Sequence, residues 1–413
     1  MQNKYIKMVD VLIIGAGPAG TLAASLLKQK GRSVQIIEKA IFPRFSIGES
    51  LLPRCMDHLQ EAGMLEAVKA QGFQQKFGAK FKKDDLACDF DFTDQFTESW
   101  KWTWQVPRAE FDQTLATEAE KKGIPILYEH TVTDIQFNDS SSVTTIEDKL
   151  GKQTKVAAKF VIDASGFGRV LPRLLQLDTP SDLPPRSSFF THVIDKSRPE
   201  GQEGERIVII VHDVNTWIWL IPFSNGKTSV GIVANPSFFQ EFEGTQEERM
   251  RAMIDTVPLA KERLAGLDFD FEPIEITAFA KKTKALYGKG FCLTGNASEF
   301  LDPIFSSGVS FAMESGVLSA KLIDRELGGE EVDWESEYVN YLQQGLETFK
   351  TYINAWYDGT LQTIFFNPQT NPTIKKQICS VLAGYVWDLS NPYVKKHKRA
   401  VKVLSQFLEM AST

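Results

Sequence analysis

Hydrophobic and polar positions form a regular succession of blocks over residues 10–38, where two apolar runs flank a glycine-rich turn and a helical pattern. Val11–Ile14 is a continuous apolar run, which is typical of a buried parallel strand, and Ser33–Ile37 is a second such run. Between them, Thr21–Lys30 has the periodicity of a crossover helix. The pattern therefore predicts a strand–helix–strand unit near the start of the chain.

The turn of this unit reads GAGPAG over positions 15–20, and each glycine there meets a physical need. Gly15 permits the tight turn, and Gly17 lets backbone N–H groups approach a pyrophosphate at a helix N-terminus. Gly20 allows close packing of helix on strand, and Pro18 suits the first helical turn. Glu38 ends the second strand, where a carboxylate accepts hydrogen bonds from ribose hydroxyls. Its negative charge disfavours a 2′-phosphate. Together these residues predict a dinucleotide site.

Nucleotide-binding signals are interrupted and then resume further along the chain. Phe160–Ala164 is another apolar strand, and Gly290–Gly295 precedes a long helical pattern, Val309–Leu327. Between them, segments such as Glu205–Val211 and Thr228–Val233 alternate as antiparallel strands do. We therefore expect a discontinuous α/β nucleotide-binding domain of Rossmann-like type that carries an inserted, mainly antiparallel β-sheet.

The rest of the chain is predicted to be helical, with breaks at Asn367–Pro372 and Asn391–Pro392. The net charge of −7 disfavours nucleic acid as a partner, and the basic stretch Lys395–Lys402 is interpreted as a solvated helix face. No apolar segment has the length of a membrane span or the form of a secretory signal, so we expect a cytoplasmic protein without stable membrane insertion.

Cysteine and histidine are scattered rather than clustered. The four cysteines form no CxxC pair, and the five histidines lack the spacing of metal ligands; they are Cys55, Cys88, Cys292 and Cys379, and His58, His130, His192, His212 and His397. We therefore expect reduced thiols and no metal site.

Four segments carry a resemblance that covers nearly the whole chain. They are FPRFSIGESLLP at 42–53, WQVPRAEFDQTL at 104–115, WIWLIP at 217–222 and FLDPIFSSG at 300–308. The chain resembles the flavin-dependent halogenases, within the superfamily of FAD-dependent monooxygenases and geranylgeranyl reductases. WIWLIP fits the family signature WxWxIP, and FLDPIFSSG fits F-x-x-P-x-x-S-x-G. The resemblance implies FAD as the dinucleotide, with its isoalloxazine extended toward the inserted sheet.

The resemblance also implies the division of the chain. We expect an FAD-binding domain from 1–75, 104–178 and 272–330, a substrate-binding β-sheet domain from 76–103 and 179–271, and a helical C-terminal region from 331–413. It implies that the cofactor contacts are Gly15, Gly17, Ala19, Gly20, Glu38, Lys39, Arg44, Glu49, Ser50, Arg108, Gly295, Asn296, Pro303, Ser307, Gly308 and Val309. Asn296 replaces the usual acidic residue of the superfamily, and its amide is still able to bind a ribityl hydroxyl.

The chemistry that the resemblance implies begins with reduced FAD, O2 and a halide, chloride or bromide, which together form hypohalous acid. The halide would bind at Ser307 and Gly308, where helix N–H groups are free. A wall made by Trp217, Trp219, Ile221 and Pro222 would separate flavin from substrate. As these residues also suit a packed strand face, both interpretations hold.

A lysine delivers the electrophile in the resembled family, and the matching segment here is QKFGAKF at 75–81. We expect Lys76 to be catalytic, with Lys80 as the second candidate. A single strand over this segment would place Lys76, Gly78 and Lys80 on one face. From spacing alone, a solvated strand face is the simpler interpretation.

The substrate class rests on Phe305, which stands where tryptophan halogenases carry a glutamate. This difference favours phenols or pyrroles, either free or tethered to an acyl or peptidyl carrier protein, with a separate flavin reductase as the source of reduced flavin. Tail aromatics at helical spacing line a substrate pocket or form ordinary core: Phe349, Tyr352, Trp356 and Tyr357. The alternatives are a reductase or dehydrogenase of the geranylgeranyl-reductase type, a hydroxylating monooxygenase and a flavoprotein without catalysis.

Overall fold

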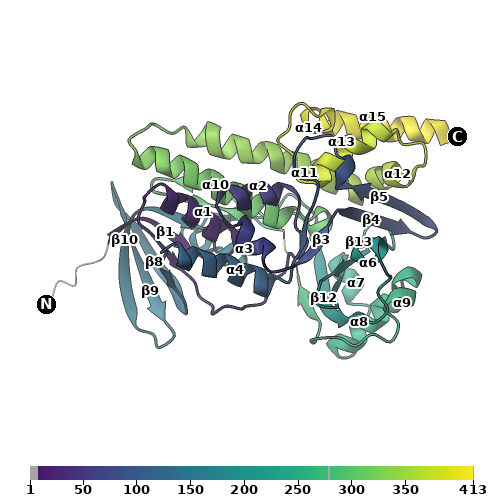
Figure 1. The fold of residues 1–413 in the computed structure, drawn as a ribbon, viewed down its shortest axis with the longest axis horizontal. Coiled ribbons are helices and arrows are strands. Elements are labelled where there is room, and N and C mark those ends of the chain that lie inside the picture. The colour runs from purple at the N-terminus through teal and green to yellow at the C-terminus, as the bar shows by residue number, and fades with distance from the viewer. Residues whose placement is uncertain (1–7, 278–279, 413) are drawn as a thin grey trace.

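The computed structural model describes residues 8–277 and 280–412, which form two large β-sheets side by side along the long axis of the molecule (Figure 1). The first sheet has the order β18-β19-β10-β1-β2-β7, with β8 and β9 attached next to β10. Its strands are β1 (Met8–Ile14), β2 (Val34–Ile37), β7 (Ile126–Leu127), β8 (His130–Phe137), β9 (Ser142–Asp148), β10 (Gln153–Asp163), β18 (Tyr287–Gly288) and β19 (Phe291–Leu293). The strands from β19 to β7 are parallel, as the apolar runs predicted.

Both faces of β1 are buried, which explains why its sequence is apolar without alternation. Val11 and Ile13 face a core that they share with helices α1 (Pro18–Gln29), α4 (Arg108–Lys121) and α10 (Ser307–Leu327). Leu12 and Ile14 face the β8–β9 hairpin and α5 (Val170–Leu174) on the other side. The predicted strand–helix–strand unit is therefore confirmed.

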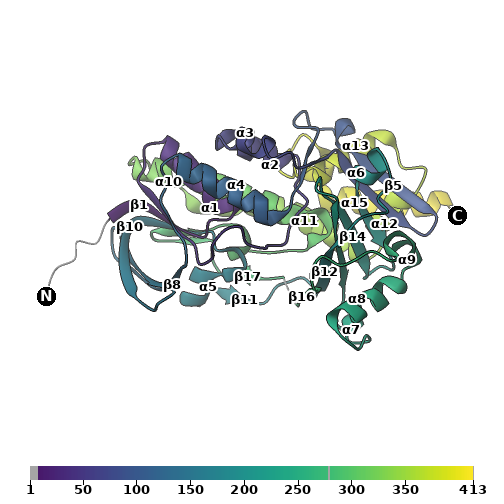
Figure 2. The ribbon, with the colours of Figure 1, turned by 60° about the horizontal axis from the view of Figure 1, so that its bottom comes forward.

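The second sheet has the order β16-β12-β15-β14-β13-β4-β5 and is mainly antiparallel. Its strands are β4 (Gly78–Lys83), β5 (Leu86–Asp91), β12 (Ser187–Ile194), β13 (Ile207–Val211), β14 (Trp217–Pro222), β15 (Lys227–Ala234) and β16 (Ile274–Ile276). One face is covered by short helices, α7 (Pro236–Phe239), α8 (Gln246–Asp255) and α9 (Pro258–Leu264) (Figure 2). The predicted boundary at residue 271 was too early, because β16 pairs with β12 as an edge strand of this sheet.

The C-terminal helices pack across both halves of the molecule (Figure 1). After a π-helical turn at Glu335–Asn340 they are α11 (Tyr341–Tyr357), α12 (Thr360–Phe366), α13 (Pro372–Leu382), α14 (Pro392–Lys395) and α15 (His397–Ser412). The Phe365 ring of α12 lies 4.9 Å from Phe81 and 4.7 Å from Phe90 in the second sheet. The tail thus shares a core with the sheet. None of the helices described here has the length and hydropathy needed to cross a membrane.

The segment around Lys76 differs from its prediction as one strand. It forms two strands in different sheets, β3 (Gln74–Lys76), which pairs with β6 (Thr103–Gln105), and β4, which begins at Gly78. A Cβ atom at Gly78 would lie 1.9 Å from the carbonyl oxygen of Phe90, so glycine is required where the chain enters the second sheet. Consequently Lys76 and Lys80 do not share a strand face. The other connecting elements are α2 (Arg54–Glu61), α3 (Leu65–Lys69), α6 (Gln202–Glu205), β11 (Asp178–Thr179) and β17 (Lys282–Thr283).

Candidate functional site

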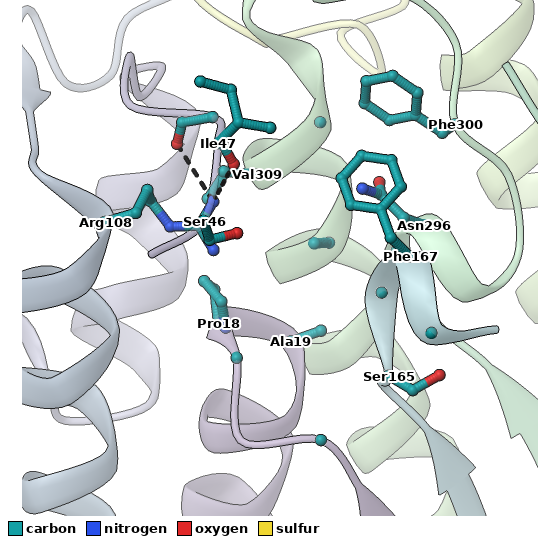
Figure 3. Close-up of a pocket in the computed structure, with 18 of the residues that line it drawn as sticks. Pro18, Ala19, Ser46, Ile47, Arg108, Ser165, Phe167, Asn296, Phe300 and Val309 are labelled. Carbon is teal, nitrogen blue, oxygen red and sulfur yellow. Dashed lines mark hydrogen bonds between the residues drawn. The ribbon is translucent and has the colours of Figure 1, made fainter. Parts of the chain in front are cut away.

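A cavity of about 430 Å³ lies between the two sheets, at the carboxyl ends of β1 and β10. Figure 3 shows Pro18 and Ala19 of α1, the Ser165–Phe167 turn, and Asn296 and Val309 around it. The residues assigned to the cofactor that line this cavity are Gly15, Gly17, Ala19, Glu38, Lys39, Arg44, Glu49, Ser50, Arg108, Gly295, Asn296, Pro303, Gly308 and Val309. Gly20, Ser307 and Pro222 are not among the described residues that line it.

The glycine-rich turn shapes one end of the cavity. Gly15 has a φ of 102°, and a Cβ atom on it would lie 2.5 Å from the carbonyl oxygen of Ala164. A Cβ on Gly20 would lie 2.0 Å from the carbonyl oxygen of Gly15. Gly17 caps α1 without a side-chain hydrogen bond, so the first N–H groups of this helix are free for an anion. The turn therefore fits a pyrophosphate.

Glu38 and Arg44 lie beside this turn. The Glu38 carboxylate accepts hydrogen bonds from the backbone N–H groups of Ala16 at 2.8 Å and Ala40 at 2.9 Å, which fixes its orientation. Each carboxylate oxygen still has a lone pair for a ribose hydroxyl. One Arg44 nitrogen lies 3.6 Å from the position of a Cβ on Gly17, so its charge is close to the phosphate position. These residues fit the adenosine end of a dinucleotide.

Arg108, expected as a cofactor contact, also forms hydrogen bonds within the protein. Its guanidinium forms a bidentate pair with Asp112, at 2.8 and 3.0 Å, and donates to the carbonyl oxygen of Ile47 at 2.7 Å (Figure 3). These bonds use the Nε, Nη1 and Nη2 atoms. Arg108 therefore lines the cavity and at the same time holds the segment 45–50 in place.

Trp217, Trp219 and Ile221 project from β14 and line the other end of the cavity. The Trp219 indole donates to the Ser229 hydroxyl at 3.0 Å. On the neighbouring strand, a Cβ atom on Gly231 would lie 2.0 Å from the Trp219 ring, so the absent side chain makes room for the indole. The two tryptophans therefore form a wall with a fixed position.

Trp217 is linked to the loop 300–308 through a residue of α11. Its indole N–H donates to the Tyr357 hydroxyl at 3.0 Å, and that hydroxyl donates to Asp302 at 3.0 Å. Burial raises the pKa of Asp302 from its usual 3.8 to about 6, against the lowering effect of hydrogen bonds from Ile304 and Tyr357. Tyr357 was expected to line a pocket or to belong to the core; it packs against the core and also connects the tryptophan wall with this loop.

The loop ends at the N-terminus of α10. Ser306 has a φ of 56°, an unusual backbone conformation for serine, and caps the helix without a side-chain hydrogen bond to it. The first N–H groups of α10, from Ser307 onward, are therefore free of intrahelical partners, and Gly308 lines the cavity. This arrangement suits a small anion.

Lys76 is buried, with 2% of its surface exposed, and the described residues that line the cavity do not include it. Its Nζ donates to the Ser50 hydroxyl and to the carbonyl oxygen of Leu51, both at 2.8 Å. Burial lowers the pKa of Lys76 from 10.5 to about 7. Because Ser50 lines the cavity and also accepts from Ser306 at 3.1 Å, a single hydroxyl separates the amine from the cavity.

Lys80, the second lysine candidate, has a different environment. Its amine donates to Glu203 at 2.6 Å, on the second sheet and at a partly exposed position. Lys82 also pairs with Glu203, at 3.1 Å. Lys80 is thus part of a surface ion-pair group.

Among the residues that the structure describes, no group of three or more His, Cys, Asp and Glu side chains could hold a metal ion.

Sequence reasoning missed two participants: Tyr357 as a hydrogen-bonding residue, and His192. The Nε2 atom of His192 lies within hydrogen-bond distance, 2.7 Å, of the Glu49 carboxylate. These residues are 143 positions apart, and no local pattern connects them. Ser306 lies within the motif at 300–308 that the sequence identified, and what the structure adds is its hydrogen bond to Ser50.

Comparison with known proteins gives consistent matches. Residues 8–334 match the family model described as FAD binding domain. The chain is 29% identical over 405 residues, 92% of its length and 89% of the relative's, to a 1H-pyrrole-2-carbonyl-(peptidyl-carrier protein) chlorinase of Pseudomonas fluorescens. Among solved structures, a flavoprotein/dehydrogenase of Cytophaga hutchinsonii is 56% identical, with a TM-score of 0.97 over 98% of this chain and 100% of that one. The flavin-dependent brominase Bmp2 is 26% identical, with a TM-score of 0.86 over 97% and 100%.

The α/β fold, the dinucleotide cavity and these matches define an FAD-dependent oxidoreductase. FAD is its cofactor, as the resemblance to the flavin-dependent halogenases implied. Within this class, the chain belongs to the FAD binding domain family and, more narrowly, to the flavin-dependent halogenases.

Proposed function

We propose that this enzyme uses reduced FAD, O2 and chloride or bromide to halogenate an electron-rich aromatic compound of the phenol or pyrrole type. The observation that carries the proposal is the position of Lys76. Its amine is buried, partly deprotonated near neutral pH, and one hydroxyl away from the cofactor cavity. FAD, when bound and reduced, would supply the electrons that reduce O2 and so oxidise the halide.

The residues of this chain would divide the work between two compartments. The free N–H groups at the start of α10, including those of Ser307 and Gly308, would hold the halide by charge–dipole attraction. Trp217 and Trp219 would keep the substrate from the flavin. This division allows oxidation of the halide on one side and halogenation of carbon on the other.

Lys76 would receive the hypohalous acid. In its protonated form the amine donates a hydrogen bond to the oxygen of the acid and polarises the oxygen–halogen bond. In its neutral form the nitrogen attacks the halogen, a nitrogen–halogen bond forms, and hydroxide leaves with the amine proton as water. The aromatic carbon then takes the halogen and loses its own proton, so the amine is restored. A pKa of about 7 makes both forms available.

The substrate proposal rests on Phe305 and on the relatives. Phe305 is buried and packs against Trp356, with ring centres 6.1 Å apart, so no carboxylate from this position reaches the acid. An electron-rich ring needs less activation, which favours phenols and pyrroles. The chlorinase relative acts on a pyrrole bound to a peptidyl-carrier protein. We extend this to a substrate that is free or tethered to an acyl or peptidyl carrier, with a separate flavin reductase, in the cytoplasm.

The test is a product assay with the purified enzyme, a flavin reductase system, air and either halide. The substrates are phenols and pyrrole-2-carbonyl thioesters, each offered free and on a carrier protein, and the products are analysed by mass spectrometry. A halogenated product that depends on the halide and on O2 supports the proposal. If reduced FAD is consumed and no substrate gains halogen with either halide, the proposal is wrong.

The second candidate is a dehydrogenase or reductase that uses the same cofactor. The 56% identical structure from Cytophaga hutchinsonii is described as a flavoprotein/dehydrogenase, which favours this alternative. Such an enzyme would change the substrate mass by two hydrogens and would not depend on halide. A hydroxylating enzyme would instead add one oxygen atom, so the same mass spectra separate the three activities.

A further inference from the structure

Glu49 is a buried carboxylate in the wall of the FAD cavity, with 1% of its surface exposed. One oxygen, Oε1, lies 2.7 Å from Nε2 of His192. The other oxygen, Oε2, has no hydrogen-bond partner within the part of the chain that the structure describes. A buried charged oxygen without a partner is costly, so its retention here indicates a partner that arrives with a ligand.

The environment of Glu49 keeps its carboxylate in place. Its backbone carbonyl oxygen accepts a hydrogen bond from the N–H group of Val106 at 2.7 Å. The His192 ring that holds Oε1 is packed between Phe223 and Phe271, with ring centres 5.2 and 5.0 Å away. The carboxylate therefore cannot easily turn to find another partner.

The register of the second sheet places this pair at the ring end of the cavity. His192 lies opposite Ser229, and Ser229 lies opposite Ile221, so the three side chains share one face and one cross-strand row. Ile221 lines the cavity, as does Trp219. The residue after Glu49 is Ser50, whose hydroxyl accepts a hydrogen bond from Ser306. The His192 ring that holds Glu49 therefore lies in the same cross-strand row as Ile221 of the tryptophan wall.

We propose that Glu49, held by His192, is the acceptor for the ring N–H group that flavin carries in both its oxidised and reduced forms, and that its negative charge lowers the reduction potential of FAD. An ionised carboxylate accepts hydrogen bonds only, and the flavin ring presents N–H donors. In a buried site, a fixed negative charge disfavours the addition of electrons to its neighbour. The result is a reduced flavin that transfers electrons to O2 more readily.

The proposal rests on the FAD site and not on halide chemistry, so its test needs neither halide nor substrate. The midpoint potential of bound FAD is measured anaerobically in the wild type, Glu49→Gln and Glu49→Asp. Dissociation constants for oxidised and reduced FAD are measured in parallel. Glu203→Gln is the matched control, because it removes one carboxylate that is paired with Lys80 and Lys82 on the second sheet.

We expect Glu49→Gln to favour reduced over oxidised FAD about tenfold relative to the wild type, which is roughly +30 mV for a two-electron couple. Glu49→Asp keeps the negative charge but moves it away from the flavin, because its side chain is one methylene shorter. It should therefore give a smaller shift of the same sign, and it replaces the glutamine variant if that variant does not fold. Glu203→Gln should leave the potential unchanged. If Glu49→Gln weakens the binding of oxidised and reduced FAD equally, Glu49 contacts a ribityl hydroxyl and the proposal is wrong. An unchanged or lower midpoint potential would also overturn it.

Discussion

Lys76 and Ser306 donate to the same oxygen atom. The Lys76 Nζ lies 2.8 Å from the Ser50 Oγ, and the Ser306 Oγ lies 3.1 Å from it. A serine hydroxyl has two lone pairs and one proton, so both donors leave the Ser50 proton free to be donated elsewhere. Ser50 also lines the cavity. The amine and the loop 300–308 are therefore connected through one group that lines the cavity.

Lys76→Ala should abolish halogenation, a fall of at least about a thousandfold if the amine forms or polarises the halogenating species. FAD affinity should stay within about twofold, since the described lining of the cavity lacks Lys76. Product per reduced FAD consumed is the measurement, with Lys80→Ala as the control because Lys80 pairs with Glu203. Full product from the Lys76 variant would remove this residue from the mechanism.

Ser50→Ala should slow product formation by roughly ten- to a hundredfold, on the scale of a lost proton-transfer or positioning group. Ser50 accepts from the amine and so favours its charged form, and its loss should lower the pKa of Lys76 further below about 7. The limb of the pH–rate profile that reports this amine should therefore move to lower pH, and Ser50→Thr should restore it. A slower enzyme with an unmoved profile would indicate only a packing role.

The stability of the protein should depend on Lys76 above neutral pH. Burial lowers the folded-state pKa from 10.5 to about 7, so between these values the folded chain binds fewer protons than the unfolded chain. Wild-type stability should then rise with pH across this window. Lys76→Met has no such proton, so its stability relative to the wild type should fall by roughly 3 kcal/mol from pH 7 to pH 9.5, at 1.36 kcal/mol per pKa unit. Urea unfolding at several pH values measures this; parallel curves would contradict it.

Asp302 should produce the opposite dependence at lower pH. Its folded-state pKa is raised from 3.8 to about 6, so the protonated carboxyl stabilises the fold below pH 4 and that stability is lost as the pH rises to 6. Asp302→Asn removes this dependence and should gain roughly 2 kcal/mol over the wild type between pH 4 and pH 7. Thermal unfolding of both proteins across this range is the check, with Asp182→Asn, at an exposed ion pair, as the control. A constant difference would mean that Asp302 stays ionised.

The sequence predicted those parts of the fold that depend on near neighbours. The strand, turn and helix at 8–29 follow from apolar runs and from glycines whose missing side chains admit nearby backbone atoms. Lys76 was placed on the wrong kind of face, because periodicity does not show that the chain leaves one sheet for another at Phe77. Its burial comes from packing around Phe92 and from acceptors at Ser50 and Leu51, which only the folded chain brings together.

The partnerships of the site could not be predicted, for a related reason. Glu49 and His192 come from a connecting segment and from β12, and Asp302 meets Tyr357 from a loop and from the end of α11. Each pair joins segments whose local patterns are complete without the other. Sequence motifs located the walls of the cavity, whereas the hydrogen bonds behind those walls depend on how the two sheets and the tail are arranged.

Gly231 gives the tryptophan wall an unusual dependence. The Trp219 ring occupies the space where any side chain at 231 would begin, and this space is on the strand behind the ring, not in the cavity. The position of this cavity wall therefore depends on an atom that is missing from a neighbouring strand. A single added methyl group at 231 would overlap the indole and displace it, so a residue that does not line the cavity controls the position of the side chain that forms its wall.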